Sequence, residues 1–341
     1  MRKLYLLIAL SLISACSQWP PNVDNTMGEV SPFQEGLTAR YFGASTLLIS
    51  DGKTSILIDG FFTRPDPFEA AVFGMKSDYD ALEERIRYYD IDAVLISHDH
   101  FDHILDSGNV ACIKEATLYG ASTAIGIASD QIMMPKSRCP RPAAEQISMY
   151  TVVSDEQQRI GEFTVTFYAT RHSTKKWLSR SGESIYMTVS RGGQYKCAGT
   201  NFSYLITHPG YPKSRILVVP SAGDPGETLS GVEADVVFLS VGLLSTQSDK
   251  EIRNYWSQTV ERTNAKAIIP IHWDNLSGTV LKPPPIFIDN PMASISTLGD
   301  FNNGLNERRR KDGEKPVCIL FPPSESQFRI DGEKCPIATV P

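Results

Sequence analysis

SHDHFDH, residues 97–103, contains three of the six histidines in this chain of 341 residues. The stretch has the form H-x-H-x-D-H and directly follows residues 93–96, an apolar run that predicts a short buried strand. Neutral imidazole nitrogens with a carboxylate form a ligand set that divalent metal ions prefer. The stretch therefore predicts a metal-binding loop at the end of a strand, in a protein of the α/β class.

Three other candidate ligands also follow expected strands: His172 after residues 162–170, Asp224 after 215–220 and His272 after 267–271. The carboxyl ends of strands gather ligand sites in α/β sheets, so we expect these side chains to converge on the 97–103 loop. Taken singly, each has another interpretation. A lone histidine is often hydrogen-bonded inside a core, and an aspartate between Gly and Pro often forms a turn.

His208 serves as a contrast to these candidates. It precedes the strand that leads to Asp224, and that strand spans about 20 Å at about 3.3 Å per residue. We therefore expect His208 at the opposite end of the sheet, as a surface turn residue and not as a ligand.

The order and spacing of these residues resemble the metallo-β-lactamase superfamily over roughly residues 36–290. The segment LIDGFF, residues 57–62, is also similar to the first hairpin of that family. The branches that the chain resembles include bacterial ascorbate-phosphate lactonase and N-acyl-phosphatidylethanolamine-hydrolysing phospholipase D. However, residues 196–203 lack the tryptophan-rich segment of the phospholipase branch. The resemblance implies a four-layer αβ/βα sandwich with the metals at one edge.

The resemblance also implies a role for each candidate ligand. His98, His100 and His172 would hold one metal; Asp102, His103 and His272 would hold the second; and Asp224 would bridge the two. The expected cofactor is a pair of Zn²⁺ ions, with Mn²⁺ or Fe as alternatives. Asp99 is not a ligand in the family, which leaves it either orienting a histidine or solvated.

These roles predict a metal-dependent hydrolase that acts on an ester, lactone or phosphodiester bond of an anionic substrate, a small molecule or a lipid. Two metals ~3.5–4 Å apart can share one hydroxide as the nucleophile, with Asp102 and Asp224 as the catalytic carboxylates that hold them. The alternatives are a lipid-anchored binding or scaffold protein that retains the metal pocket, and a true β-lactamase. The expected substrate contacts are Arg64, Lys175, Trp177 and Trp273.

The first 35 residues predict a targeting segment and a linker. Residues 1–15 have the charged start and apolar stretch of a signal peptide, and ISAC, residues 13–16, resembles the lipobox of bacterial lipoproteins. Cys16 would then carry acyl groups such as palmitate and anchor the chain in the cell envelope, at the outer membrane facing the periplasm. Cleavage after Ala15 by an ordinary signal peptidase is the alternative.

Membrane fractionation tests the anchor. We expect Cys16→Ser to release the protein into the soluble fraction, because the variant would lack the acyl chains that anchor it in the bilayer. An unchanged distribution would refute acylation.

The rest of the chain divides into a linker (16–35), a metallo-β-lactamase-like domain (36–300) and a charged, loop-like C-terminal extension (301–341) with one edge strand at 317–321. The net charge of −6 without a basic block argues against a nucleic-acid partner. An oxidising compartment permits disulfides, and sequence proximity suggests Cys112 with Cys139 and Cys318 with Cys335, although spacing alone does not fix the pairing.

Overall fold

The computed structural model describes residues 24–26, 36–66, 76–133, 138–139, 145–173, 199–276, 289–321, 327–330 and 332. The signal peptide, Cys16 and nearly all of the linker lie outside these residues, so the lipid anchor stays a prediction. Among the described residues, no helix combines the length and apolarity needed to cross a bilayer.

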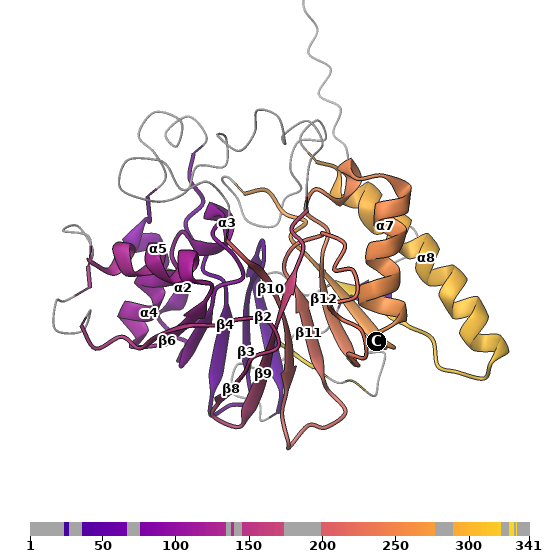
Figure 1. Cartoon of the computed structure of the whole chain (residues 1–341), viewed down its shortest axis with the longest axis horizontal. Helices are drawn as coiled ribbons and strands as arrows, with labels where there is room; N and C mark the ends of the chain where they lie inside the picture. The colour runs from indigo at the N-terminus through magenta and orange to yellow at the C-terminus, as the bar shows by residue number, and fades with distance from the viewer. Residues whose placement is uncertain are drawn as a thin grey trace, which may run out of the picture.

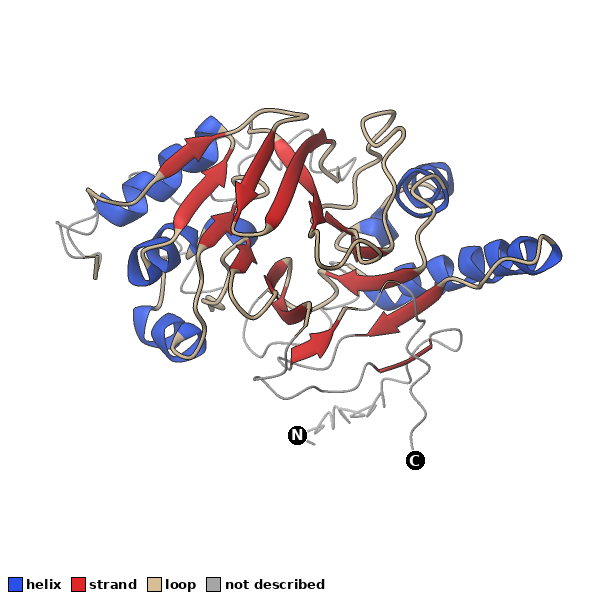
Figure 2. Ribbon diagram, turned by 90° about the horizontal axis from the view of Figure 1, so that it is seen from below, coloured by secondary structure: helices blue, strands red, loops and turns tan. Residues whose placement is uncertain are grey.

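Two mixed β-sheets lie between two layers of helices (Figures 1 and 2). One sheet has the strand order β15 (Gln327–Arg329), β2 (Thr38–Gly43), β3 (Thr46–Ser50), β4 (Ser55–Ile58), β5 (Ala93–Leu95), β6 (Thr117–Gly120), β7 (Met149–Thr151). The other has the order β1 (Asp24–Thr26), β14 (Cys318–Phe321), β13 (Ala267–Ile271), β12 (Val236–Ser240), β11 (Ile216–Val219), β10 (Asn201–Thr207), β9 (Phe163–Thr170), β8 (Gln157–Ile160).

The helices form the outer layers. Those that accompany the first sheet are α2 (Tyr79–Ile86), α3 (Phe101–Ile104), α4 (Ser107–Lys114) and α5 (Ser122–Met133). Those that accompany the second sheet are η1 (Leu244–Thr246), α7 (Asp249–Trp256), η2 (Ser257–Glu261) and α8 (Pro291–Lys311). The expected four-layer αβ/βα sandwich is therefore confirmed.

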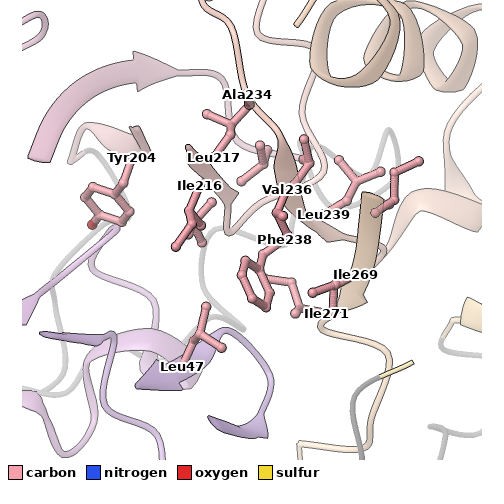
Figure 3. Close-up of a cluster of buried hydrophobic side chains, with 14 of the residues drawn as sticks. Leu47, Tyr204, Ile216, Leu217, Ala234, Val236, Phe238, Leu239, Ile269 and Ile271 are labelled. Atoms are coloured by element: carbon pink, nitrogen blue, oxygen red, sulfur yellow. The ribbon is translucent and has the colours of Figure 1, made fainter. Parts of the chain in front are cut away.

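Strand β4 shows how the layers are held together. Ile56 and Ile58 face the other sheet and join the larger core, whereas Leu57 faces the helices and joins a second core. Because side chains alternate between the two faces of a strand, an apolar run of this kind is buried on both sides. Figure 3 shows the core between the sheets, where Leu47 of the first sheet approaches Phe238 of the second.

The parallel parts of both sheets end at one edge. Strands β4 to β7 are parallel to one another, and so are β11 to β14. Strand β9 runs in the direction of β11, because both are antiparallel to β10. The loops after β5, β9, β11 and β13 therefore leave the sheets at the same edge, and these loops carry the expected ligands.

The C-terminal region corrects one expectation. Residues 303–311, expected as a loop, belong to helix α8, which runs across the boundary drawn at residue 300. Asn290 caps the helix by accepting from the Ala293 backbone N–H, and Pro291 occupies the first turn. Strand β14 is also not an edge strand, since it lies between β13 and β1.

The structure confirms one disulfide, between Cys112 in α4 and Cys139 beyond α5. Cys318 is also disulfide-bonded, while its expected partner, Cys335, lies outside the described residues. Oxidised cysteines suit the oxidising compartment that the N-terminal segment predicts.

Candidate metal centre

The expected ligands form two compact groups at the shared edge of the sheets, where α3 stands at the upper ends of the central strands in Figure 1. One group contains His98, His100 and His172, and the other contains Asp102, His103 and His272. Within each group, the candidate ligand atoms lie within 4.8 Å of one another. Side chains spread over a long stretch of sequence therefore meet as the strand directions predict.

In the first group, contacts with neighbouring atoms orient the histidine rings. His98 turns its Nδ1 toward the hydroxyl of Ser97 at 3.0 Å, and its Nε2 lies 3.0 Å from Nδ1 of His100. The Nδ1 of His172 lies 2.6 Å from the carbonyl oxygen of Ser173, and the His172 ring lies against those of His98 and His100, with centroids 4.6 and 4.4 Å away. Contacts of this kind select the tautomer of a ligand histidine and orient its ring.

The second group is tied together through Asp102. Its Oδ2 lies 3.0 Å from Nε2 of His272 and 3.5 Å from Nε2 of His103. The other oxygen, Oδ1, is buried and has no hydrogen-bond partner among the described residues. A buried carboxylate oxygen without a partner is costly unless a cation satisfies it.

Asp59 holds His103 from behind, and the sequence analysis did not assign it this role. The Oδ2 of Asp59 lies 2.7 Å from Nδ1 of His103, and its carboxylate also accepts from the hydroxyls of Ser45 and Ser97 and from the Ser97 backbone N–H. Asp59 follows β4 with a φ of +54°, a conformation that Asp tolerates better than most residues. Its place at the end of a strand, beside Gly60, was the available signal.

Electrostatics favour the neutral form of the three histidines in the first group, whereas in the second the burial of His272 is outweighed by Asp102, which raises its pKa. Burial, reinforced by the other histidines, holds the pKa of His98 well below its usual value. Burial likewise lowers the pKa of His172 well below the usual value and that of His100 to about 4. Burial alone would raise the pKa of Asp102, but His103 and His272 outweigh it and hold that pKa below its usual range. Neutral imidazoles and an ionised carboxylate are the forms that bind metal.

This donor set fits two divalent ions. Each group offers three donors, all buried or half-buried, and the set combines imidazole nitrogens with the unpaired oxygen of Asp102. Three protein ligands leave coordination positions open for water or substrate, as in catalytic metal sites. The two groups therefore fit a dinuclear centre.

Asp224, the expected bridge, belongs to neither group. Its Oδ1 accepts from the Gly226 backbone N–H at 2.9 Å, and its Oδ2 lies 3.4 Å from the side-chain amide of Asn254. These contacts match the turn-forming alternative, and the bridging role stays a prediction. The segment does lie beside the site, because a Cβ on Gly223 would come within 2.6 Å of the backbone of His172.

Asp99 is buried, which excludes the solvated alternative. Its carboxyl lies next to the hydroxyl of Thr123 and the backbone of Gly199: a Cβ added to Gly199 would meet both side chains within 3 Å. Burial raises the pKa of this carboxyl. Asp99 therefore borders α5 and the start of β10.

Two of the expected substrate contacts lie inside the protein. The side chain of Arg64 is 5% exposed and pairs with Asp274, and Trp273 is 6% exposed and packs against Tyr41 and Phe321. Both were expected to contact the substrate, but their side chains belong to the packing around the His272 loop. The other two expected contacts, Lys175 and Trp177, lie outside the described residues.

His208 belongs to neither metal-ligand group, as expected. It is not a freely solvated turn residue, however. Its Nε2 lies 3.0 Å from Oδ2 of Asp51, its Nδ1 accepts from the Gly210 backbone N–H, and its ring contacts Phe163. His208 thus links the turn after β10 to the turn after β3 and joins the two sheets.

Comparison with solved structures finds several similar chains. Yeast PDE1 superposes with a TM-score of 0.52 at 13% identity, covering 87% of this chain and 100% of the other. The metallo-beta-lactamase fold protein YhfI from Bacillus subtilis gives 0.48 at 15% identity, covering 86% and 100%. The isothiocyanate hydrolase from Delia radicum gut bacteria gives 0.48 at 14% identity, covering 86% and 99%.

No curated protein matches the sequence. A family profile described as the beta-lactamase superfamily domain matches residues 54–273, which is more than half of the chain and includes both ligand groups. The chain therefore belongs to the beta-lactamase superfamily.

Proposed function

We propose that this protein is a binuclear metal-dependent hydrolase that cleaves an ester, lactone or phosphodiester bond of an anionic substrate. The observation that carries the proposal is the convergence of two three-residue donor groups at one edge of the sheets. A single structural metal would need one closed set of four ligands, whereas two adjacent groups of three leave open positions.

The charge of the site supports an anionic substrate. Asp102 is the only carboxylate in the two groups, and the first group consists of histidines whose lowered pKa values keep them neutral. Two bound divalent cations would exceed this negative charge, would lower the pKa of a water molecule they share to about 7 and would stabilise an oxyanion. An anionic group on the substrate would be drawn to the remaining positive charge.

The protein's own part in the reaction is to hold the donors in place. Asp59 and two serines fix the ring of His103, and Ser97 turns His98 toward its group. The backbone N–H of Phe202, in β10, donates to the Ser97 carbonyl at 2.9 Å and joins the metal loop to the second sheet. Groups that are oriented before the substrate arrives need no rearrangement during the reaction.

A substrate panel tests the function. Protein purified without chelators should contain close to two metal ions per chain. It should then hydrolyse at least one member of a panel of bis-p-nitrophenyl phosphate, p-nitrophenyl esters and simple lactones. Chelation should abolish this turnover and added Zn²⁺ should restore it, because the donors alone provide no activated water.

The His208→Ala variant is the matched control, since this histidine lies outside both groups, and it should retain metal and turnover. Full metal loading without hydrolysis across the panel would overturn the proposal and favour a binding protein. Turnover of a β-lactam alone would assign the chain to the β-lactamases.

A further inference from the structure

The backbone of His272 adopts a conformation that needs support. Its φ is +60°, in the left-handed region that only a few per cent of non-glycine residues occupy. Such conformations persist where the surroundings determine them, and they concentrate at functional sites. The contacts that determine this one come from the other sheet.

The first contact is with Tyr41, on β2. The backbone N–H of His272 lies 3.0 Å from the hydroxyl oxygen of Tyr41 and 2.7 Å from the carbonyl oxygen of Ala44. The Tyr41 side chain is fully buried. A tyrosine hydroxyl can accept one hydrogen bond, here from the His272 N–H, while it donates another.

The second contact fixes the Tyr41 hydroxyl itself. It lies 3.0 Å from Oδ1 of Asp274, and that oxygen also accepts from the Ala44 backbone N–H at 2.7 Å. The opposite oxygen of Asp274 lies 3.1 Å from a guanidinium nitrogen of Arg64, which is stacked over the ring of Phe61. Because this network is buried, its members have little freedom to rearrange.

The third feature is a missing side chain at Gly242. A Cβ at this position would lie 2.5 Å from Nδ1 and 2.9 Å from Cγ of His272. Real Cβ atoms do not approach other atoms so closely, so the imidazole fits only because residue 242 is a glycine. The ring then places its Nε2 at Asp102.

We propose that Tyr41 is a positioning residue for the second ligand group, acting through the backbone of His272, and that Gly242 leaves the space its ring needs. Tyr41 and Gly242 together fix the position of His272, so that Asp102, His103 and His272 form a site before metal binds. This inference rests on the proposed two-metal centre. It predicts that Tyr41 and Gly242 control the metal affinity of the second group and do not affect that of the first.

Metal titration of the Tyr41→Phe variant tests the proposal. This change removes only the hydroxyl and keeps the ring that packs on Trp273. Metal-free protein is titrated with Co²⁺, followed by its visible absorption, and with Zn²⁺ against a chromophoric chelator. One of the two dissociation constants should rise about 10–100-fold, the usual effect of losing a hydrogen bond behind a ligand, while the other stays unchanged.

A His172→Ala background identifies the affected group. That change disables the first group, so Tyr41→Phe should still weaken the single remaining site in this background. Thr263→Val is the control: it deletes a buried hydroxyl that donates to the Thr259 carbonyl, near the start of β13 and away from His272. It should reduce thermal stability and leave both dissociation constants unchanged.

Gly242→Ala gives an independent reading, with Gly126→Ala as its control because a Cβ at residue 126 meets nothing within 4 Å. Only the former should weaken the second site. If both metal dissociation constants of the Tyr41→Phe variant equal those of the wild type, or if both rise equally, the inference is overturned. A wild-type protein that binds no metal would instead overturn the two-metal centre.

Discussion

Replacing Asp102 with asparagine is expected to abolish hydrolysis and to remove one of the two metal ions. Asp102 is the only carboxylate among the six donors. Asparagine keeps the size of the side chain but lacks its negative charge. It would also leave His103 and His272 without the anion that lies within 3.5 Å of both. The loss of kcat/KM should exceed the 10–100-fold that follows from removing a partner behind a ligand.

Two measurements check this expectation: kcat/KM on the best substrate of the panel, and metal content by elemental analysis. Asp51→Asn is the matched control. Asp51, in the turn between β3 and β4, pairs with His208 and belongs to neither ligand group. That variant should keep both ions and full turnover. An Asp102→Asn protein that holds two ions and retains more than a tenth of wild-type kcat/KM would contradict the assigned role.

Removing the metal ions is expected to lower the free energy of unfolding by several kcal/mol. Each group takes ligands from both halves of the sandwich: the first combines the loop after β5 with His172 after β9, and the second combines α3 with His272 after β13. An ion that binds only the folded chain stabilises it by about 4 kcal/mol at a free concentration of about 1,000 times Kd. The urea midpoint of chelator-treated protein should therefore fall well below that of Zn²⁺-loaded protein.

The metal-free protein should also lose stability in acid. The unfolded chain protonates its histidines near pH 6.5, whereas burial lowers the pKa of His100 to about 4 and those of His98 and His172 well below the usual value. The unfolded state thus binds more protons below pH 6.5, and stability falls as the pH drops from about 6.5 toward 4. His100 alone accounts for about 2 kcal/mol between pH 7.5 and pH 5, with His272, whose pKa is raised, acting in the opposite sense.

Urea unfolding at the two pH values, with and without metal, measures both effects. The Asp102→Asn variant should show about half of the metal-dependent shift, because it retains one complete group. Equal midpoints for loaded and chelated protein would show that the ions do not link the two sheets. A metal-free protein more stable at pH 5 than at pH 7.5 would contradict the assigned histidine pKa directions.

The sequence predicted the ligand groups because their signals are local. The motif at residues 97–103 is continuous, and His172 and His272 each stand just after an apolar run that forms a strand. Strand β13 has the expected bounds, since a continuous apolar run of this length is typical of a buried strand. The four-layer sandwich came from resemblance to a family, and the structure confirms it.

The supports of those ligands could not be predicted in the same way. The contact between Tyr41 and His272 joins residues 231 positions apart, and Asp274 meets Arg64 from a different sheet. No periodicity or motif encodes such a meeting, because it depends on how two sheets face each other. The burial of the Arg64 and Trp273 side chains, which were expected to contact the substrate, could not be predicted for the same reason.

Helix α8 was missed for a different reason. Its C-terminal run of basic residues resembles a solvated loop when only charge is considered. Cations near the end of a helix interact favourably with its dipole, and Arg308 and Arg309 also reach Glu261 and Asn264. Leu298 and Leu305 are buried one heptad apart on the same helix, a spacing that outweighs the charge pattern.

The division of ligands between the two halves of the chain has a consequence for biogenesis. When residues 97–103 have been synthesised, neither donor group is complete, because His172 and His272 are added to the chain much later. The second group closes only when β13 docks beside β12 and residue 272 reaches Asp102. Metal binding at the proposed centre would therefore require that most of the chain has been synthesised and that the two sheets have met.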